Sequence, residues 1–216
     1  MSTCCSAYSD AAGHQFDAHK VAEELAGYRK NGPGPTTRLL RDSLVDASLV
    51  EGVLLDIGAG FGALTFELLQ HGSTRAIAVD ASPSYLAAAA DEAGRRGNAG
   101  SVQLVHGDFV DLAATLPRAE VVTLDRVVCC YPDVEPLLTS ALEHAARTLA
   151  LSYPRGIWYV HLVMAVDNLR RRIAGNTFRT FVHAPATIER LIRDAGFRLS
   201  SRRRTWMWSV DVFVRV

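Results

Sequence analysis

Acidic residues follow four short apolar runs of the sequence, and the first of them opens a series of alternating glycines. The series reads Asp56-Ile57-Gly58-Ala59-Gly60-Phe61-Gly62. Glycines at this spacing let the backbone turn sharply and let a ligand lie against it with no Cβ in between. A helix that begins after such a turn adds unpaired N–H groups and the positive end of its dipole. This arrangement suits a nucleotide-like ligand without selecting one.

Asp56 discriminates between two such ligands. Gly58, Gly60 and Ala63 satisfy the dinucleotide pattern G-x-G-x-x-G/A, which seats a pyrophosphate on the helix N-terminus. A carboxylate beneath the turn would then lie close to negatively charged phosphates. S-adenosylmethionine instead carries an ammonium group, which a nearby carboxylate stabilises. Asp56 therefore favours S-adenosylmethionine over NAD, and an NAD-dependent oxidoreductase is the alternative.

Asp80 and Asp108 could hold the rest of such a cofactor. Asp80, followed by Ala81, ends the second apolar run, where a carboxylate can accept hydrogen bonds from both ribose hydroxyls. It could equally cap the helix that follows. Asp108, in Gly107-Asp108-Phe109, could accept a hydrogen bond from the exocyclic amine of adenine, with Phe109 packed beside the ring. A Gly-Asp pair after a strand is also an ordinary turn.

Alternating strands and helices must position these residues. Short apolar strands separated by helices indicate a parallel sheet covered on both faces. The last two strands have only a short connection, which permits an antiparallel hairpin alone. We expect helices over 16–28, 36–49, 63–70, 83–95, 136–147 and 157–169, and strands over 53–57, 76–80, 102–105, 121–124, 149–152, 197–205 and 207–214. Thr36 and Gly72 are the expected caps of the second and third helices.

The composition is that of one ordinary globular domain. The 216 residues are 49% hydrophobic and 21% charged, and 23 basic residues balance 23 acidic ones. Proteins that neutralise many phosphates carry a basic excess, so nucleic-acid binding is disfavoured and the arginine runs 170–172 and 202–204 are expected to be solvated. No apolar run reaches the roughly 18 residues that span a bilayer. The first 20 residues do not resemble a signal peptide. We expect a cytoplasmic protein.

The four cysteines form two adjacent pairs, Cys4-Cys5 and Cys129-Cys130. Neighbouring cysteines bridge each other only with strain, which indicates a reducing compartment. Cys4 and Cys5, together with His14 and His19, match no closed zinc site, so no metal is expected. Residues 1–15 are small and polar, and we expect them to be poorly ordered.

In their order along the chain, these motifs resemble those of class I S-adenosylmethionine-dependent methyltransferases. The similarity rests on residues 56–62, Asp80, Gly107-Asp108 and Asp125-Arg126, and covers roughly residues 36–216. It implies a Rossmann-like α/β fold, with a seven-stranded, mostly parallel sheet, one antiparallel strand and helices on both faces. It also implies the following contacts with S-adenosylmethionine: Gly58 to Gly62 with the amino-acid part, Asp80 with the ribose, Asp108 and Phe109 with adenine, and Asp125 and Arg126 beside the sulfonium.

A closer similarity is to magnesium-protoporphyrin O-methyltransferases. It rests on the segments 124–132 and 177–183, which keep their order and spacing. The sequence differs from those enzymes in its short, cysteine-bearing N-terminus, which leaves another acceptor open. We expect residues 1–35 to form a tail and a lid-like helix, followed by a methyltransferase domain over 36–216.

Four side chains are candidates for the acceptor side of the site: Tyr131, His161, His183 and Tyr28. Each of them also has a purely structural interpretation, as part of a turn, an apolar helix, a helix cap or a packed helix face. The apolar helix over 157–169 favours a small or medium organic acceptor with apolar surface. Oxygen is the expected acceptor atom, and a carboxylate, as on a porphyrin, would need no general base. A non-catalytic S-adenosylmethionine-binding protein is the alternative to an enzyme, and the oligomeric state stays open.

Overall fold

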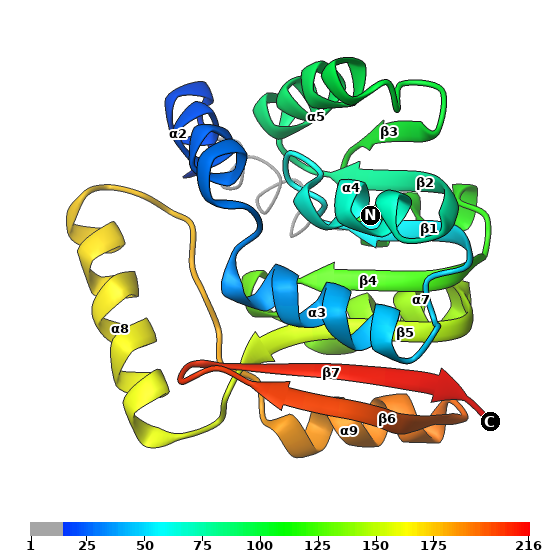
Figure 1. Cartoon of the computed structure of the whole chain (residues 1–216). Helices are drawn as coiled ribbons and strands as arrows, with labels where there is room; N and C mark the ends of the chain where they lie inside the picture. The colour runs from blue at the N-terminus through cyan, green and yellow to red at the C-terminus, as the bar shows by residue number, and fades with distance from the viewer. Residues whose placement is uncertain (1–14) are drawn as a thin grey trace.

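The strands form one seven-stranded sheet in the order β3-β2-β1-β4-β5-β7-β6 (Figure 1). The structure, a computed structural model, describes residues 15–216. The strands are β1 (Gly52–Ile57), β2 (Ser73–Asp80), β3 (Val102–His106), β4 (Ala119–Asp125), β5 (Ala145–Pro154), β6 (Phe197–Arg204) and β7 (Trp208–Arg215). Neighbouring strands are parallel except for β7, which runs antiparallel to β5 and β6. The predicted fold, with one reversed strand, is confirmed.

Helices follow the strands as the alternating pattern predicts. They are α2 (Ala18–Asn31), α3 (Pro35–Asp46), α4 (Ala63–Gln70), α5 (Pro83–Arg96), α6 (Phe109–Leu112), α7 (Val134–His144), α8 (Trp158–Ile173) and α9 (Pro185–Asp194). Two short 3-10 turns, η1 (Ala113–Thr115) and η2 (Val128–Cys130), flank β4. The expectations for Cys4, Cys5 and His14, and for the order of the first residues, concern a segment that lies outside the described residues.

Two expected helix caps are wrong. α3 begins at Pro35 with Gly34 as its N-cap, so Thr36 lies inside the helix. Proline suits this position because the first helical residues have no intrahelical partner for their N–H groups. α4 ends with His71, not Gly72, as its C-cap.

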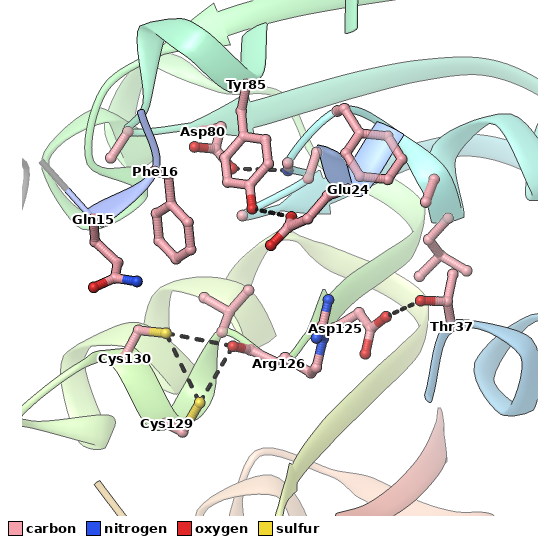
Figure 2. A pocket seen from close by; sticks show the side chains of 18 of the residues that line it. Gln15, Phe16, Glu24, Thr37, Asp80, Tyr85, Asp125, Arg126, Cys129 and Cys130 are labelled. Carbon is pink, nitrogen blue, oxygen red and sulfur yellow. Dashed lines mark hydrogen bonds between the residues drawn. The ribbon is translucent and has the colours of Figure 1, made fainter. Parts of the chain in front are cut away.

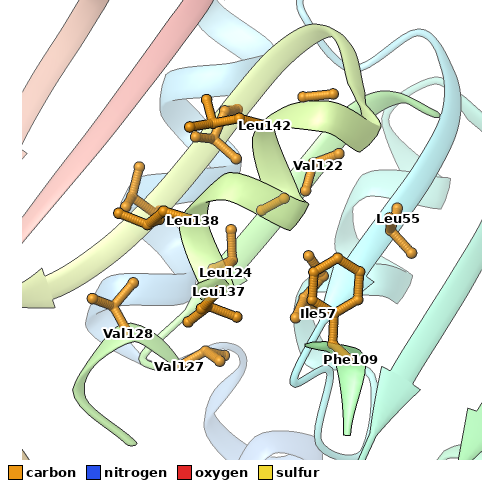
Figure 3. Packing of buried hydrophobic residues seen from close by; sticks show 14 of the residues in the cluster. Leu55, Ile57, Phe109, Val122, Leu124, Val127, Val128, Leu137, Leu138 and Leu142 are labelled. Carbon is orange, nitrogen blue, oxygen red and sulfur yellow. The ribbon is translucent and has the colours of Figure 1, made fainter. Parts of the chain in front are cut away.

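Side-chain alternation along the strands divides the core into two layers. Successive residues of a strand point to opposite faces of the sheet. Leu54 accordingly packs with α3 and α4 on one face, and Leu55 packs with α7 and α9 on the other. Figure 3 shows the second layer, in which Ile57 and Phe109 lie near the leucines of α7. Each large apolar side chain buried in this way contributes roughly 1.5–3 kcal/mol.

The carboxyl ends of the parallel strands meet at one edge of the sheet, and α2 and α8 both lie beyond that edge (Figure 1). Ligands of open α/β sheets bind at this edge. Only Val160 and Met164 of α8 are buried, so this helix packs little against the rest of the chain. Within residues 15–216, no helix is both long and apolar enough to cross a bilayer.

The second arginine run is not solvated throughout. Asp211 of β7 is fully buried and accepts hydrogen bonds from Arg202 at 2.9 and 2.7 Å and from the Tyr153 hydroxyl at 2.7 Å. Burial and the Asp211 charge raise the pKa of Tyr153. The hydrogen bonds to Asp211 raise the pKa of Arg202. Sequence alone did not predict this ion pair, because it depends on the register of β6 against β7.

Replacing Asp211 by Asn should lower the free energy of unfolding by about 3 kcal/mol, because it leaves the Arg202 charge without its buried partner. Urea unfolding followed by circular dichroism measures the loss. Arg203→Ala is the control, since Arg203 follows Arg202 on β6 and forms an exposed ion pair with Asp46 of α3. Its loss should cost less than about 1 kcal/mol. Equal, small losses in both variants would contradict a structural role for the buried pair.

Candidate active site

The turn after β1 has a backbone conformation that side chains resist. Gly58, Gly60 and Gly62 have φ angles of +64°, +58° and +86°. A Cβ on Gly58 would also come within 2.4 Å of a methyl group of Val127. The Gly58 N–H donates to the carbonyl of Val79 at 2.8 Å, which ties the turn to β2. α4 begins directly after Gly62. The glycines therefore connect the end of β1 to the N-terminus of α4 through a short, tight turn.

A cavity of about 300 Å³ lies beside this turn, at the carboxyl ends of β1, β2 and β4 (Figure 2). Several of the residues predicted to bind a cofactor line it: Asp56, Gly58, Ala59, Gly60, Asp80, Ala81, Asp125 and Arg126. The structure therefore brings together the residues that follow three separate strands, as the parallel topology requires.

Asp56 lies at the floor of the cavity and is only 2% exposed. Its two carboxylate oxygens accept hydrogen bonds from the hydroxyls of Thr65 and Thr123, both at 2.6 Å. Thr65 belongs to α4 and Thr123 to β4, so one carboxylate connects three elements. Burial raises the pKa of Asp56 to about 6, and the two hydroxyl hydrogen bonds oppose that rise.

Asp80 is fixed by backbone groups. Its Oδ2 accepts from the Gly60 N–H and its Oδ1 from the Ser82 N–H, both at 2.8 Å. The alternative role as a helix cap falls to Ser82, whose hydroxyl accepts from the backbone of α5. Each carboxylate oxygen of Asp80 retains a second lone pair for a ligand hydroxyl. Burial raises the pKa of the Asp80 carboxyl.

Asp125 and Arg126 form the side of the cavity below β4. The Asp125 carboxylate accepts from the hydroxyls of Thr37 at 2.5 Å and Ser152 at 2.6 Å. Arg126 has a φ of +61°, a conformation that costs a residue other than glycine roughly 1–3 kcal/mol and clusters at functional sites. Its N–H donates to the Ser152 hydroxyl at 2.8 Å, which holds the strained residue in place.

Helix α2 and the residues just before it form a wall of the cavity whose individual residues the sequence did not predict. Phe16, Lys20 and Glu24 line the cavity. Figure 2 shows the Tyr85 hydroxyl meeting the Glu24 carboxylate, at 2.5 Å, with Phe16 beside them. The rings of Phe16 and Tyr85 are 5.0 Å apart. Burial and the Glu24 carboxylate raise the pKa of Tyr85. The helical periodicity indicated a packed face, but nothing local indicated that the cavity lies beneath it.

The opposite wall comes from η2 and from the segment around α8. Cys129 and Cys130 line the cavity, and both thiols donate to the carbonyl of Arg126. Phe178 lies beside them, with the Arg171 guanidinium 5.4 Å from its ring centroid. Arg171 was expected on a solvated face. Arg171 instead lies in the cavity wall, because the chain that follows α8 returns and places Phe178 beside it.

None of the four acceptor-side candidates lines the cavity. His161 is exposed on α8. Tyr131 is buried, and a ring nitrogen of His183 lies 2.9 Å from its carbonyl oxygen. Tyr28 donates to Glu67 at 3.0 Å, and its ring packs on Phe61 with centroids 5.4 Å apart. Packing thus accounts for three of these residues, and we assign none of the four a role in the site.

The third predicted cofactor segment, Gly107 to Phe109, also lies outside the cavity lining, as does Gly62. The ring of Phe109 is buried in the core and packs edge-to-face on His144, and its expected contact with adenine stays a prediction. Asp108 accepts from the Tyr131 hydroxyl through Oδ1, while its Oδ2 is buried with no hydrogen-bond partner among the described residues. An exocyclic amine would satisfy that oxygen.

These residues fit a cationic ligand that bears hydroxyl groups. The hydrogen bonds described for Asp56, Asp80 and Asp125 all come from hydroxyl or backbone N–H groups. Within residues 15–216, none of these three carboxylates forms an ion pair with a basic side chain, so an ammonium or sulfonium group would stabilise their charges and a pyrophosphate would not. The sequence-based preference for S-adenosylmethionine agrees with this geometry.

Comparison with known proteins identifies the class. Residues 54–151 match the family described as "Methyltransferase domain". The fold is similar to the crystal structure of magnesium protoporphyrin IX methyltransferase from Synechocystis PCC 6803 with bound SAH, with a TM-score of 0.68 and 20% identity over 84% of this chain and 82% of that one. It is also similar to an O-methyltransferase family protein from Burkholderia thailandensis, with a TM-score of 0.69 and 18% identity over 84% of this chain and 55% of that one. Residues 54–151 therefore form a methyltransferase domain on the fold of these two solved structures, which supports the predicted class I S-adenosylmethionine-dependent methyltransferase.

Curated relatives correct the predicted acceptor. A "Ribosomal protein L11 methyltransferase" of Nitrosococcus oceani is 36% identical over 77% of this chain and 52% of the relative, and one of Xanthomonas axonopodis pv. citri is 36% identical over 50% and 31%. The chain thus spans about half or less of the relatives' length. Their names give a protein as the acceptor. The prediction of a small-molecule acceptor with apolar surface is therefore wrong.

The raised pKa of Asp56 should make stability depend on pH. The folded protein binds the Asp56 proton more tightly than the unfolded chain, so the free energy of unfolding should fall as pH rises from 3.8 to about 6. Asp56→Asn removes this loss. The variant should gain roughly 3 kcal/mol relative to the wild type between pH 4 and pH 7, measured by urea unfolding at several pH values. A difference that does not change with pH would contradict the raised pKa.

Gly58→Ala should weaken binding of S-adenosylhomocysteine at least about tenfold and lower the free energy of unfolding by about 1–3 kcal/mol, because the added Cβ meets Val127 and the backbone becomes strained. Calorimetric titration measures the affinity. Gly94→Ala on α5 is the matched control, since its Cβ would meet no atom within 4 Å, and it should leave the affinity unchanged. Identical affinities of the two variants for S-adenosylhomocysteine would show that the glycine turn is not part of the binding site.

Proposed function

We propose that this chain transfers a methyl group from S-adenosylmethionine to a carboxylate oxygen on a protein. The use of S-adenosylmethionine is supported by three carboxylates that line one cavity, Asp56, Asp80 and Asp125. Within residues 15–216, their hydrogen bonds come from hydroxyl and backbone N–H groups. S-adenosylmethionine, when bound, supplies a methyl group activated by its positively charged sulfur.

The chain's own residues would bind and orient the cofactor. Asp80, fixed by two backbone N–H groups, would accept from the ribose hydroxyls. Asp56 and Asp125 would stabilise the ammonium and sulfonium charges, since both lie at the ends of neighbouring strands. Asp108 would accept from the adenine amine through its unpartnered Oδ2. The glycine turn lets the ligand lie directly against the backbone.

Three cations around the same cavity support an anionic acceptor. Lys20, Arg126 and Arg171 line it from α2, β4 and α8. They would attract a carboxylate and repel a protonated amine. A carboxylate is already deprotonated at neutral pH, so it needs no general base. The names of the curated relatives support a protein as the molecule that carries it.

We also propose that α2 acts as a lid over the bound cofactor, and that residues 36–216 form the methyltransferase domain. Phe16 and Glu24 cover the cavity from above and contact Tyr85 of α5. A second attachment lies further along α2, where Arg29 donates to the buried Glu92 at 2.8 and 2.9 Å. Release of these contacts would open the cavity to solvent, which must be excluded while the methyl group moves.

Incubation with S-adenosylmethionine labelled in its methyl group tests the transfer. A soluble protein extract of the source organism and its purified ribosomal proteins serve as separate acceptor fractions. We expect label on protein that mild alkali releases as methanol, because methyl esters hydrolyse under conditions that leave methylamines intact. Label that resists alkali would contradict an oxygen acceptor, and label found only in small molecules would contradict a protein acceptor.

The Asp80→Asn variant tests whether the methyl transfer depends on the cavity. It should weaken S-adenosylhomocysteine binding at least about tenfold, equivalent to 1.4 kcal/mol, and reduce labelling in parallel. Asp91→Asn is the matched control, because Asp91 is an exposed carboxylate of α5 away from the cavity. Unchanged affinity in Asp80→Asn would contradict the proposed ribose contact.

A further inference from the structure

One face of α8 is apolar and exposed along its whole length. At about 100° per residue, the side chains of Trp158, Leu162, Val166, Leu169 and Ile173 fall on one stripe. All five are exposed, whereas the buried Val160 and Met164 lie on the opposite side of the helix. We name this stripe the α8 seam. Figure 1 shows α8 standing apart from the helices that cover the sheet, with its outer side uncovered.

Contacts with the described part of the chain do not account for the stability of α8. An isolated helix of about 16 residues is marginally stable in water, and most helices in proteins depend on a packed apolar face. α8 buries only two side chains and leaves its larger apolar face in solvent. Contiguous exposed apolar patches of this kind mark interaction sites.

The seam is symmetric about its own centre. Trp158 and Ile173 are 76% and 79% exposed, and Leu162 and Leu169 are 56% and 55% exposed. Both pairs are equally spaced about the midpoint between positions 165 and 166. A twofold interface brings the same patch of two copies together, so residue i must suit residue j and j must suit i. An apolar stripe with this spacing meets that requirement when two helices lie antiparallel.

Charge selects the same orientation. α8 ends in Arg170, Arg171 and Arg172, and its first turn carries aromatic residues. Trp206 of the β6–β7 turn extends the aromatic end, since its ring stacks on Tyr159 with centroids 6.4 Å apart. A parallel pair would place arginine against arginine. An antiparallel pair places the arginine end of each copy against the aromatic end of the other, where cations and aromatic rings attract.

From these observations we propose that a second copy of this chain covers the α8 seam, forming a twofold dimer in which the two α8 helices pack antiparallel. Leu162 of one copy then meets Leu169 of the other, twice by symmetry. The inner side of α8 carries Arg171, which lines the cavity. The dimer would therefore hold one wall of each cavity in place.

Sedimentation velocity of the full chain over a wide concentration range tests the dimer. We expect a species of twice the chain mass. Leu162→Glu should raise the dimer dissociation constant about thirtyfold or more, the effect of losing a central contact. Leu199→Glu is the matched control, because Leu199 is an exposed leucine of β6 off the seam, and it should leave the dimer intact. Circular dichroism verifies that both variants fold.

A double variant tests the orientation. In Leu162→Glu combined with Leu169→Lys, an antiparallel pair places glutamate against lysine twice, so dimerisation should recover. A parallel pair would place like charges together and stay dissociated. A single-chain mass at every concentration, a dimer that survives Leu162→Glu, or a monomer that instead binds anionic vesicles through the seam would each overturn the proposal. The measurement needs neither cofactor nor acceptor, so its outcome is independent of the proposed methyl transfer.

Discussion

The buried carboxylate of Asp56 is the interaction on which the site depends. It connects β1 to Thr123 of β4 and to Thr65 in the first turn of α4. A buried charge with only hydroxyl partners is costly, as its raised pKa reflects. The same constraint makes the position useful, because the carboxylate is held rigidly at the base of a glycine turn and gains most from a cationic ligand.

The glycine turn also fixes the carboxylate at the end of the neighbouring strand, β2. Gly60 can donate to Asp80 only because its backbone takes a φ of +58°, and Asp80 is then fixed from its other oxygen by Ser82. Asp125 completes the row, held by Thr37 of α3 and Ser152 of β5. Each carboxylate is thus oriented by a different element, and the sheet register alone places the three side by side.

Sequence reasoning succeeded where a residue's position follows from its place at a strand end. Asp56, Asp80 and Asp125 were expected to contact one cofactor, and the structure places all three in one cavity because parallel strands end at one edge. Sequence reasoning did not predict that the ring of Phe109 turns into the core against His144, since the direction of a side chain after a strand depends on packing. The contact of Phe16 with Tyr85 joins residues far apart in the chain, and no local pattern encodes it.

The two sides of α8 illustrate how one helix can link the site to the molecular surface. On its inner side, Asn168 donates to the carbonyl of Thr180 at 2.7 Å and accepts from the Thr180 N–H at 2.9 Å. These bonds anchor the segment that places Phe178 in the cavity wall. On its outer side the helix presents an apolar seam that none of residues 15–216 covers. Any protein that covers the seam would restrain α8, and the restraint would reach the cavity through Asn168 and through Arg171, which lines it. The residues of α8 must therefore suit the cavity on one face and the covering protein on the other. These two requirements explain why an apolar helix lies beside a polar cavity.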